Sequence, residues 1–299
     1  MTSAIQTDNL VKKFRRVPAL QGLTLNVPEG AVYALVGPNG AGKTTAIKIL
    51  MNILRASGGR AEVLGVDSSQ IQGRRFESIG YVSENQEQPE WMTVDYLLTY
   101  LRHFYPTWDT NLEADLVKQF ELPRNRKLRH LSRGMRMKAA LASSLAYHPK
   151  LIVLDEPFTG LDPLVRDELI QGLLDRAEES TIFVSSHDLG EIETFASHVA
   201  FLEGGKLRFA EELCSLAEHF REVELTFDVP PTMPPQTPTN WMQLSNSASV
   251  VRFIDSQFDA ERTNAAIPKI FGEPRNITFS PMSLRSIFLA MAKSARNSA

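Results

Sequence analysis

The segment Gly37-Pro-Asn-Gly-Ala-Gly-Lys-Thr-Thr45 restricts the fold of this chain more than any other stretch of its sequence. It follows an apolar run at Ala31–Val36 and precedes apolar residues at helical spacing, Ile47, Leu50 and Leu54. A strand, a glycine-rich loop and a helix in this order are typical of a nucleoside triphosphate site. Backbone N–H groups of the loop and the positive end of the helix would both face the phosphates.

Each residue of the loop is a candidate ligand of ATP. We expect Lys43 to reach the β and γ phosphates and the Thr44 hydroxyl to bind Mg²⁺. An incidental glycine loop is the alternative, and the flanking strand and helix disfavour it. The candidate nucleotide contacts here are Pro38, Asn39, Gly40, Ala41, Gly42, Lys43, Thr44 and Thr45.

Two more apolar runs, Leu151–Leu154 and Thr181–Ser185, predict buried strands of a parallel sheet. The first run ends in two carboxylates, of which Asp155 is expected to hold hydrated Mg²⁺ and Glu156 to act as general base on the attacking water. The second run is followed by His187, which can hydrogen-bond the γ phosphate and position that water. A solvated strand end and a structural histidine are the alternatives, and the phosphate loop upstream favours the catalytic interpretation.

Between the loop and the carboxylate strand, the pattern at Thr93–Phe120 is helical, with a break at Pro106. It predicts a helical insertion over about residues 86–149 inside an ATPase domain of residues 1–218.

Residues 219–299 are predicted to form a small α+β domain. Alternating patterns at Val223–Val229 and Val250–Ile254 indicate strands, and Ser283 is the expected N-cap of a last helix. The apolar stripe of this helix serves core packing or a dimer contact, and its members are Leu284, Ile287, Phe288 and Met291. A crowded run of prolines predicts an extended connection: Pro230, Pro231, Pro234, Pro235 and Pro238.

Composition narrows the classes of partner. The net charge of −3 lacks the basic surplus that nucleic-acid binders usually show, so no nucleic-acid partner is expected. No signal peptide and no apolar run of about 20 residues is evident, so a spanning segment would belong to another chain. The single cysteine, Cys214, cannot form an internal disulfide, which fits the cytoplasm, and we expect it to be buried and inert.

The segment Leu131-Ser-Arg-Gly-Met-Arg136 looks like a variant of the LSGGQ signature of the ATP-binding cassette (ABC) family, and residues 5 to 215 resemble that family. The resemblance implies an α/β P-loop NTPase with a RecA-like parallel sheet core and an N-terminal antiparallel β subdomain. One phosphate group needs only one anion-binding loop. Ser132, Gly134 and Met135 would therefore cap ATP held by a second subunit. Asp162 would also contact that second subunit.

Three positions of the resemblance are less regular. Phe14 falls where an aromatic residue of the family stacks on adenine, although a core residue is the alternative. Glu84 replaces the usual glutamine and would serve as a magnesium ligand, with Gln86 as a substitute if the loop shifts. Arg133 departs from the signature, as does Met135, and both bear on how tightly a dimer closes.

Together these features predict an ATP-hydrolysing subunit of an ABC transporter. The C-terminal tail and the segment Phe104-Tyr-Pro-Thr-Trp-Asp109 look like those of bacterial ABC-2-type exporters, and this resemblance implies export. The subunit would form a homodimer or heterodimer, bind ATP and Mg²⁺, and lie on the inner face of the membrane against a permease that is a separate chain. A soluble ABC ATPase that acts on ribosomes or DNA is the alternative, disfavoured by a single cassette without heptads. A nucleotide-binding module with little hydrolysis is a third possibility, supported by Glu84.

Overall fold

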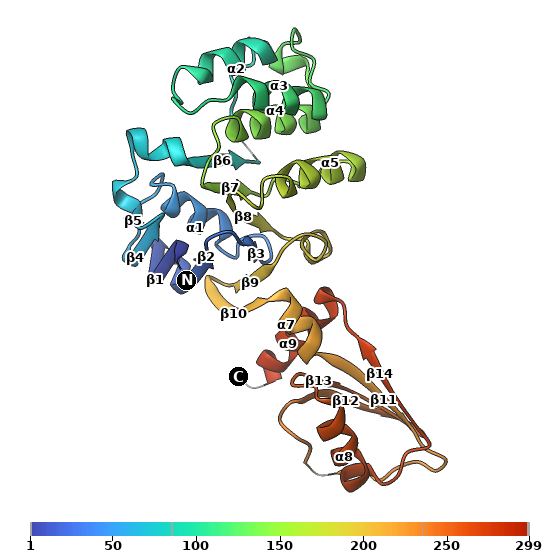
Figure 1. Cartoon of the computed structure of the whole chain (residues 1–299). Helices are drawn as coiled ribbons and strands as arrows, with labels where there is room; N and C mark the ends of the chain where they lie inside the picture. The colour runs from blue at the N-terminus through green and yellow to red at the C-terminus, as the bar shows by residue number, and fades with distance from the viewer. Residues whose placement is uncertain (1, 85, 235, 298–299) are drawn as a thin grey trace. The chain divides into compact units, whose positions relative to one another are not determined.

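The computed structural model describes residues 2–84, 86–234 and 236–297, without the side chains of 292 and 294–297. The chain divides into two compact units, of which the first ends at Ala210 and the second begins at Glu211 (Figure 1). This boundary precedes the predicted one at residue 218, because the helix Leu213–His219 belongs to the second unit.

The centre of the first unit is a six-stranded sheet with the order β10-β9-β3-β8-β7-β6. Its strands are β3 (Val32–Val36), β6 (Ile79–Ser83), β7 (Leu151–Asp155), β8 (Thr181–Ser186), β9 (His198–Glu203) and β10 (Lys206–Glu212). The pairs β9–β3, β3–β8, β8–β7 and β7–β6 are parallel. Every residue of β3, β7 and β8 is buried, which explains the apolar runs at their centres and confirms the predicted parallel core.

An antiparallel sheet with the order β2-β1-β4-β5 confirms the expected N-terminal β subdomain. Its strands are β1 (Ser3–Phe14), β2 (Val17–Pro28), β4 (Gly58–Val63) and β5 (Val66–Asp67). Helix α1 (Lys43–Leu50) buries Ile47 and Leu50 in one core cluster with Leu10, Leu23 and Val63 of this sheet. The helix that begins at the phosphate loop is thus fixed by packing on both sheets.

The segment predicted as a helical insertion contains α2 (Val94–Arg102), α3 (Thr110–Gln119) and α4 (Arg133–Leu145). Figure 1 shows these helices gathered beyond β6. Thr93 caps α2, since its Oγ1 accepts a hydrogen bond from the Tyr96 N–H at 3.1 Å. After β7 and β8 the chain forms α5 (Pro163–Leu174) and α6 (Leu189–Ile192).

The helical insertion contains a buried carboxylate, Glu113, that ties its parts together. The Oε2 atom accepts hydrogen bonds from Arg102 Nη2 at 2.7 Å and from Trp108 Nε1 at 3.0 Å. Oε1 lies 3.3 Å from Arg124 Nη1. Only 4% of the Glu113 side chain is exposed, against 40% and 39% for the two arginines.

We expect Glu113→Gln to lower the free energy of unfolding by about 2 kcal/mol, because a hydrogen bond to a charged group contributes about 1.5–3 kcal/mol. Urea denaturation of the purified chain measures the change. The control is Asp95→Asn, which removes the other carboxylate bound to Arg124 but lies on the surface, where a loss below about 1 kcal/mol is expected. Equal losses in the two variants would contradict a special role for the buried carboxylate.

The second unit is a small α+β fold, as expected. Its antiparallel sheet has the order β12-β13-β11-β14. The elements are α7 (Leu213–His219), β11 (Arg221–Thr226), β12 (Trp241–Ser247), β13 (Val250–Asp255), α8 (Ala260–Phe271), β14 (Asn276–Pro281) and α9 (Leu284–Asn297). The core of the sheet contains Trp241, Phe253 and Phe271, whose rings pack together.

The predictions for Ser283 and the described prolines of this unit are confirmed, and the prediction for Cys214 is wrong. Ser283 caps α9, because its Oγ accepts a hydrogen bond from the Ser286 N–H at 3.2 Å. The described prolines between β11 and β12 lie outside helices and strands, as predicted, whereas Pro235 lies outside the described residues. The expected burial of Cys214 is wrong, since α7 places this side chain on the surface. In the part of the chain that the structure covers, no helix has the length and apolar character needed to cross a membrane.

Candidate active site

The phosphate loop between β3 and α1 has a backbone that only glycine permits at two points. Gly42 has φ of 110°, in the left-handed region, and an added Cβ there would lie 2.5 Å from the Ala19 carbonyl oxygen. A Cβ on Gly37 would lie 2.1 Å from the carbonyl oxygen of Leu202. The glycines therefore let the loop pass close to neighbouring backbone.

A pocket of about 300 Å³ opens over this loop. It is lined by Ala19, Asn39, Gly40, Ala41, Gly42, Lys43, Thr44, Thr45, Glu84, Glu156, Thr159 and His187. The pocket therefore brings together most residues of the predicted phosphate loop with both predicted catalytic residues. Pro38 lies in the same loop and is exposed.

Lys43 and Glu156 form the centre of the site. Lys43 Nζ donates to the carbonyl oxygen of Gly37 at 2.6 Å and lies 3.0 Å from Glu156 Oε1. The other carboxylate oxygen, Oε2, lies 2.8 Å from His187 Nδ1 and accepts a hydrogen bond from Thr159 Oγ1 at 3.0 Å. The predicted base is thus held in place by a lysine, a histidine and a threonine.

The backbone and the ionisation of Glu156 both bear on its role. Its φ is 53°, in the left-handed region, a conformation that eight other non-glycine residues of the described chain share, so it does not by itself mark a functional residue. Burial by itself raises the pKa of this carboxyl, but hydrogen bonds from His187 and Lys43 outweigh burial and leave the pKa below its ordinary value. Glu156 is therefore ionised at neutral pH, as a general base must be.

Asp155 lies at the end of β7, with only 4% of the residue exposed. Its Oδ1 accepts hydrogen bonds from Thr44 Oγ1 at 3.0 Å and from Ser185 Oγ at 2.8 Å. Burial raises the pKa of this carboxyl above its ordinary value, although the two hydrogen bonds act in the opposite direction. A buried carboxylate with hydroxyl oxygens beside it offers the oxygen ligands that a hard cation prefers.

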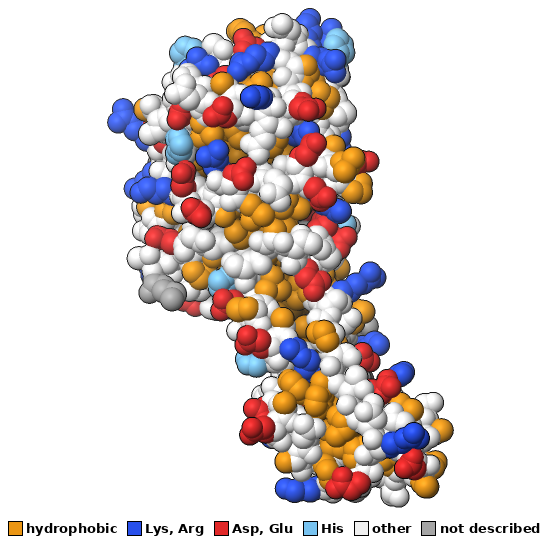
Figure 2. Space-filling view, turned by 45° about the vertical axis from the view of Figure 1, so that its right-hand side comes forward, with side chains coloured by type: hydrophobic (Ala, Val, Ile, Leu, Met, Phe, Trp, Pro, Cys, Tyr) orange, Lys and Arg blue, Asp and Glu red, His pale blue; other side chains and the backbone are white. Residues whose placement is uncertain are grey.

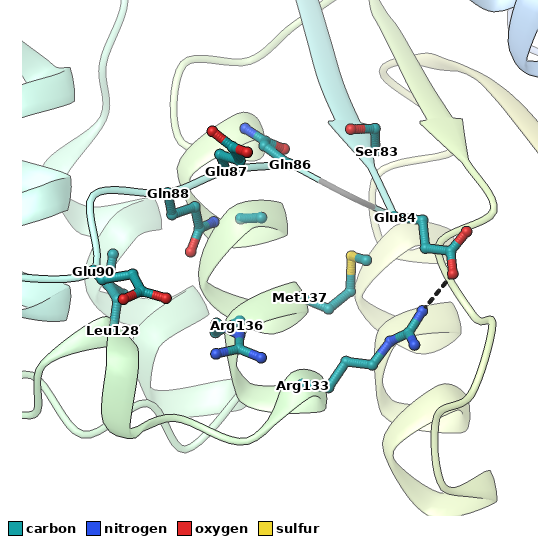
Figure 3. Close-up of a pocket in the computed structure, with 11 residues that line it drawn as sticks. Ser83, Glu84, Gln86, Glu87, Gln88, Glu90, Leu128, Arg133, Arg136 and Met137 are labelled. Atoms are coloured by element: carbon teal, nitrogen blue, oxygen red, sulfur yellow. Dashed lines mark hydrogen bonds and ion pairs between the residues drawn. The ribbon is translucent and has the colours of Figure 1, made fainter.

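Glu84 follows β6 and is fixed at the same edge of the sheet, since its N–H donates to the Asp155 carbonyl oxygen at 2.9 Å. Its side chain points to Arg133, and the two form an ion pair of 2.8 Å between Oε1 and Nη2 (Figure 3). Gln86, the predicted substitute, is exposed and lines a neighbouring groove rather than the phosphate-loop pocket. Of these two residues, only Glu84 reaches the nucleotide pocket.

The residues of the signature segment do not line the pocket over the phosphate loop. Ser132 caps α4, because its Oγ accepts a hydrogen bond from the Met135 N–H at 3.2 Å. Gly134 packs against α5, where an added Cβ would lie 2.8 Å from Val165 Cγ1. Asp162 caps α5 through a bond of 3.0 Å from the Leu164 N–H. On their own chain these residues lie at or near the N-termini of α4 and α5 and do not line the phosphate-loop pocket.

Phe14 is the last residue of β1, and 45% of it is exposed. Lys12 Nζ lies 5.0 Å from the centre of its ring. This exposure excludes the alternative of a core residue. The side chain does not line the phosphate-loop pocket, and its contact with adenine stays a prediction.

Sequence reasoning missed three residues of the site. Ser185 bonds Asp155 and also accepts a hydrogen bond from the Glu156 N–H at 3.0 Å. Ser185 lies opposite Asp155 in the β7–β8 register. Its position at the end of a predicted strand was the sequence signal that could have identified it. Arg133 was noted only as a departure from the signature, and Thr159 had no predicted role; the contacts of both depend on tertiary folding.

A metal site made by protein side chains alone is not evident. Within residues 2–84, 86–234 and 236–297, no group of three or more His, Cys, Asp or Glu side chains could hold a metal ion. This arrangement differs from a dedicated metal cage.

Comparisons with known proteins agree with this geometry. Residues 20–159 match the family model described as ABC transporter. The chain is 30% identical over 226 residues to the ABC transporter ATP-binding protein YtrB of Bacillus subtilis (strain 168), covering 75% of this chain and 77% of YtrB. It is 35% identical over 214 residues to the daunorubicin/doxorubicin resistance ATP-binding protein DrrA of Streptomyces peucetius, covering 69% of this chain and 64% of DrrA.

Among solved structures, an ATP-binding subunit of an ABC transporter superposes with a TM-score of 0.66 at 24% identity. The match covers 73% of this chain and 92% of the other. It supports the fold of the first unit.

Proposed function

The chain belongs to the ABC transporter family, and we propose on this basis that it hydrolyses ATP to drive a membrane-spanning permease that is a separate chain. The observation that supports the proposal is the meeting of Lys43, Asp155, Glu156 and His187 at the ends of neighbouring strands. In such a site the protein mainly positions the phosphates and the water and stabilises charge.

The phosphates of ATP bind to the amides of the loop and to Lys43, which exchanges its bonds to loop carbonyls and to Glu156 for bonds to the nucleotide. Glu156 then accepts a proton from the attacking water. His187, bound to the same carboxylate, orients the base and contacts the γ phosphate.

Magnesium fits the oxygen groups of this site. Thr44 and Asp155 would hold it, together with phosphate oxygens, and Glu84 is the third candidate ligand at this edge of the sheet. When bound, the ion neutralises charge on the phosphates.

We further propose that the chain works as a homodimer or heterodimer that closes around ATP. The signature residues Ser132, Gly134 and Met135 and the nearby Asp162 lie away from the phosphate loop of their own chain, so a second chain is needed to bring them to a nucleotide. Hydrolysis of ATP to ADP and phosphate would then reopen the dimer.

Phe14 is proposed to stack on adenine. Phe14→Ala is expected to weaken ATP binding about 3- to 10-fold, because an aromatic stacking pair contributes about 0.5–1.5 kcal/mol. Equilibrium binding of ATP measures the change, and Phe14→Trp should restore it. The control is Phe104→Ala, which removes another exposed ring, from the helical insertion. Equal affinity of Phe14→Ala and the unaltered chain would contradict stacking.

The transport direction is proposed to be export, at the inner face of the cell membrane. The relative DrrA has a name that refers to drug resistance, and removal of a drug from the cell gives resistance.

On the face shown in Figure 2, acidic and basic side chains are mixed rather than separated into a basic surface, which favours a protein partner over nucleic acid.

The experiment that tests this function is affinity capture of the Glu156→Gln chain from solubilised membranes with ATP and magnesium. Recovery of a multi-spanning protein supports transport, and the unaltered chain without nucleotide is the control. Recovery of ribosomal or DNA-bound complexes instead would favour an ABC ATPase outside transport.

A further inference from the structure

Two departures from the ABC sequence pattern are bound to each other in this structure. Glu84 stands where the family has glutamine, Arg133 stands inside the signature, and their side chains form the ion pair of 2.8 Å seen in Figure 3. We propose that Arg133 is a positioning residue that holds Glu84 away from the magnesium nucleotide until ATP binds and breaks the pair. This inference rests on the proposed function, because it concerns how ATP enters the same site.

Glu84 is placed to serve two partners. Its N–H is fixed to the Asp155 carbonyl oxygen beside the strand ends. Its side chain lines both the pocket over the phosphate loop and the neighbouring groove of about 620 Å³ that contains Arg133. A change of side-chain rotamer therefore suffices to move the carboxylate from one partner to the other.

Arg133 is the first residue of α4 and connects this helix to two loops. Its guanidinium binds Glu84 on one side and lies against Gly160 on the other, where an added Cβ would be 3.2 Å from Arg133 Nη1. Gly160 follows Thr159, which donates to the catalytic carboxylate of Glu156. Release of Glu84 thus frees the start of the signature helix from the edge of the nucleotide pocket.

The exposure of the pair makes an exchange feasible. The Arg133 and Glu84 side chains are 45% and 30% exposed. Exposed ion pairs shift an equilibrium by no more than about fivefold, since water and salt screen them. Magnesium takes carboxylate oxygens as ligands, so a magnesium-bound nucleotide offers Glu84 a cation in place of the arginine. Glutamine at position 84 would be neutral and could not form an ion pair with Arg133, so the two departures compensate each other in charge.

The test is equilibrium binding of the non-hydrolysable analogue AMP-PNP to the full chain, with magnesium and with EDTA. If Arg133 competes for Glu84, Arg133→Gln should tighten binding about two- to fivefold with magnesium and leave it unchanged or weakened with EDTA. Glu84→Gln should remove this effect, so that Arg133→Gln no longer tightens binding when position 84 is already glutamine.

The matched control is Arg136→Gln, which removes a second arginine from the same groove and the same helix. Thermal unfolding without nucleotide verifies that each variant is folded. An equal change with magnesium and with EDTA, or the same change in Arg136→Gln, would overturn the proposal. Failure of the unaltered chain to bind AMP-PNP under either condition would instead count against the proposed function.

Discussion

Replacing Glu156 with glutamine lowers ATP turnover by about 10²-fold or more while ATP stays bound, if this carboxylate is the general base. Glutamine keeps the size of the side chain and can still accept a hydrogen bond from Thr159, but it cannot take a proton from water. Lys43 loses its anionic partner at 3.0 Å and becomes more available to the phosphates, so ATP affinity should be equal or higher.

Two measurements separate these effects: phosphate release at saturating ATP, and equilibrium ATP binding. Glu178→Gln, an exposed glutamate of the same unit, is the control and should behave as the unaltered chain. With ATP and magnesium, the Glu156→Gln chain should also accumulate as a dimer in gel filtration, because hydrolysis no longer reopens it. Unchanged turnover would remove Glu156 from the role of base, whereas lost affinity would make it a binding residue.

The central strands of the ATPase unit were predictable because their environment leaves a simple record in the sequence. Residues of β3, β7 and β8 are buried, so the centre of each strand is an apolar run, and the buried polar residues Asp155 and Ser185 stand only at the strand ends. The functional groups follow directly at the strand ends, and parallel strands bring those ends to one edge. The cluster of Lys43, Glu156 and His187 follows from this topology.

Elements of the second unit were harder to predict for physical reasons. Strand β12 has one buried residue, Trp241, and β14 has none, so both strands contribute few strongly apolar positions to the sequence pattern. Helix α8 contains Pro268 in its interior, and proline usually ends a helical pattern. Cys214 was expected to be buried because free cysteines usually are, but α7 presents that side chain to solvent.

The ion pair between Glu84 and Arg133 could not be predicted from local sequence. The two residues are 49 positions apart, with α2 and α3 between them in the sequence, so their contact depends on the tertiary fold. Sequence reasoning treated them as two separate departures from a family pattern. Only the tertiary structure shows that one residue compensates the charge of the other.

Replacing Lys43 with methionine is expected to weaken ATP binding about 10- to 100-fold. The reason is that a hydrogen bond to a charged group contributes about 1.5–3 kcal/mol, and each 1.4 kcal/mol is tenfold in affinity. Methionine keeps the length and apolar stem of this side chain, which is only 5% exposed. In the unaltered chain, the carbonyl oxygens of Gly37 and Pro38 accept hydrogen bonds from Lys43 Nζ. The substitution removes this donor and leaves the loop sequence unchanged.

The same substitution leaves Glu156 without its cation, so loss of binding must be separated from loss of folding. Bonds to His187 and Thr159 remain on the carboxylate, and thermal unfolding without nucleotide should therefore show a modest decrease rather than collapse. Lys48→Met removes a cation from the same helix outside the pocket and serves as the control for binding. Unchanged ATP affinity in Lys43→Met would contradict the proposed site. In that case the phosphates would not bind beside the Lys43 ammonium group on this loop.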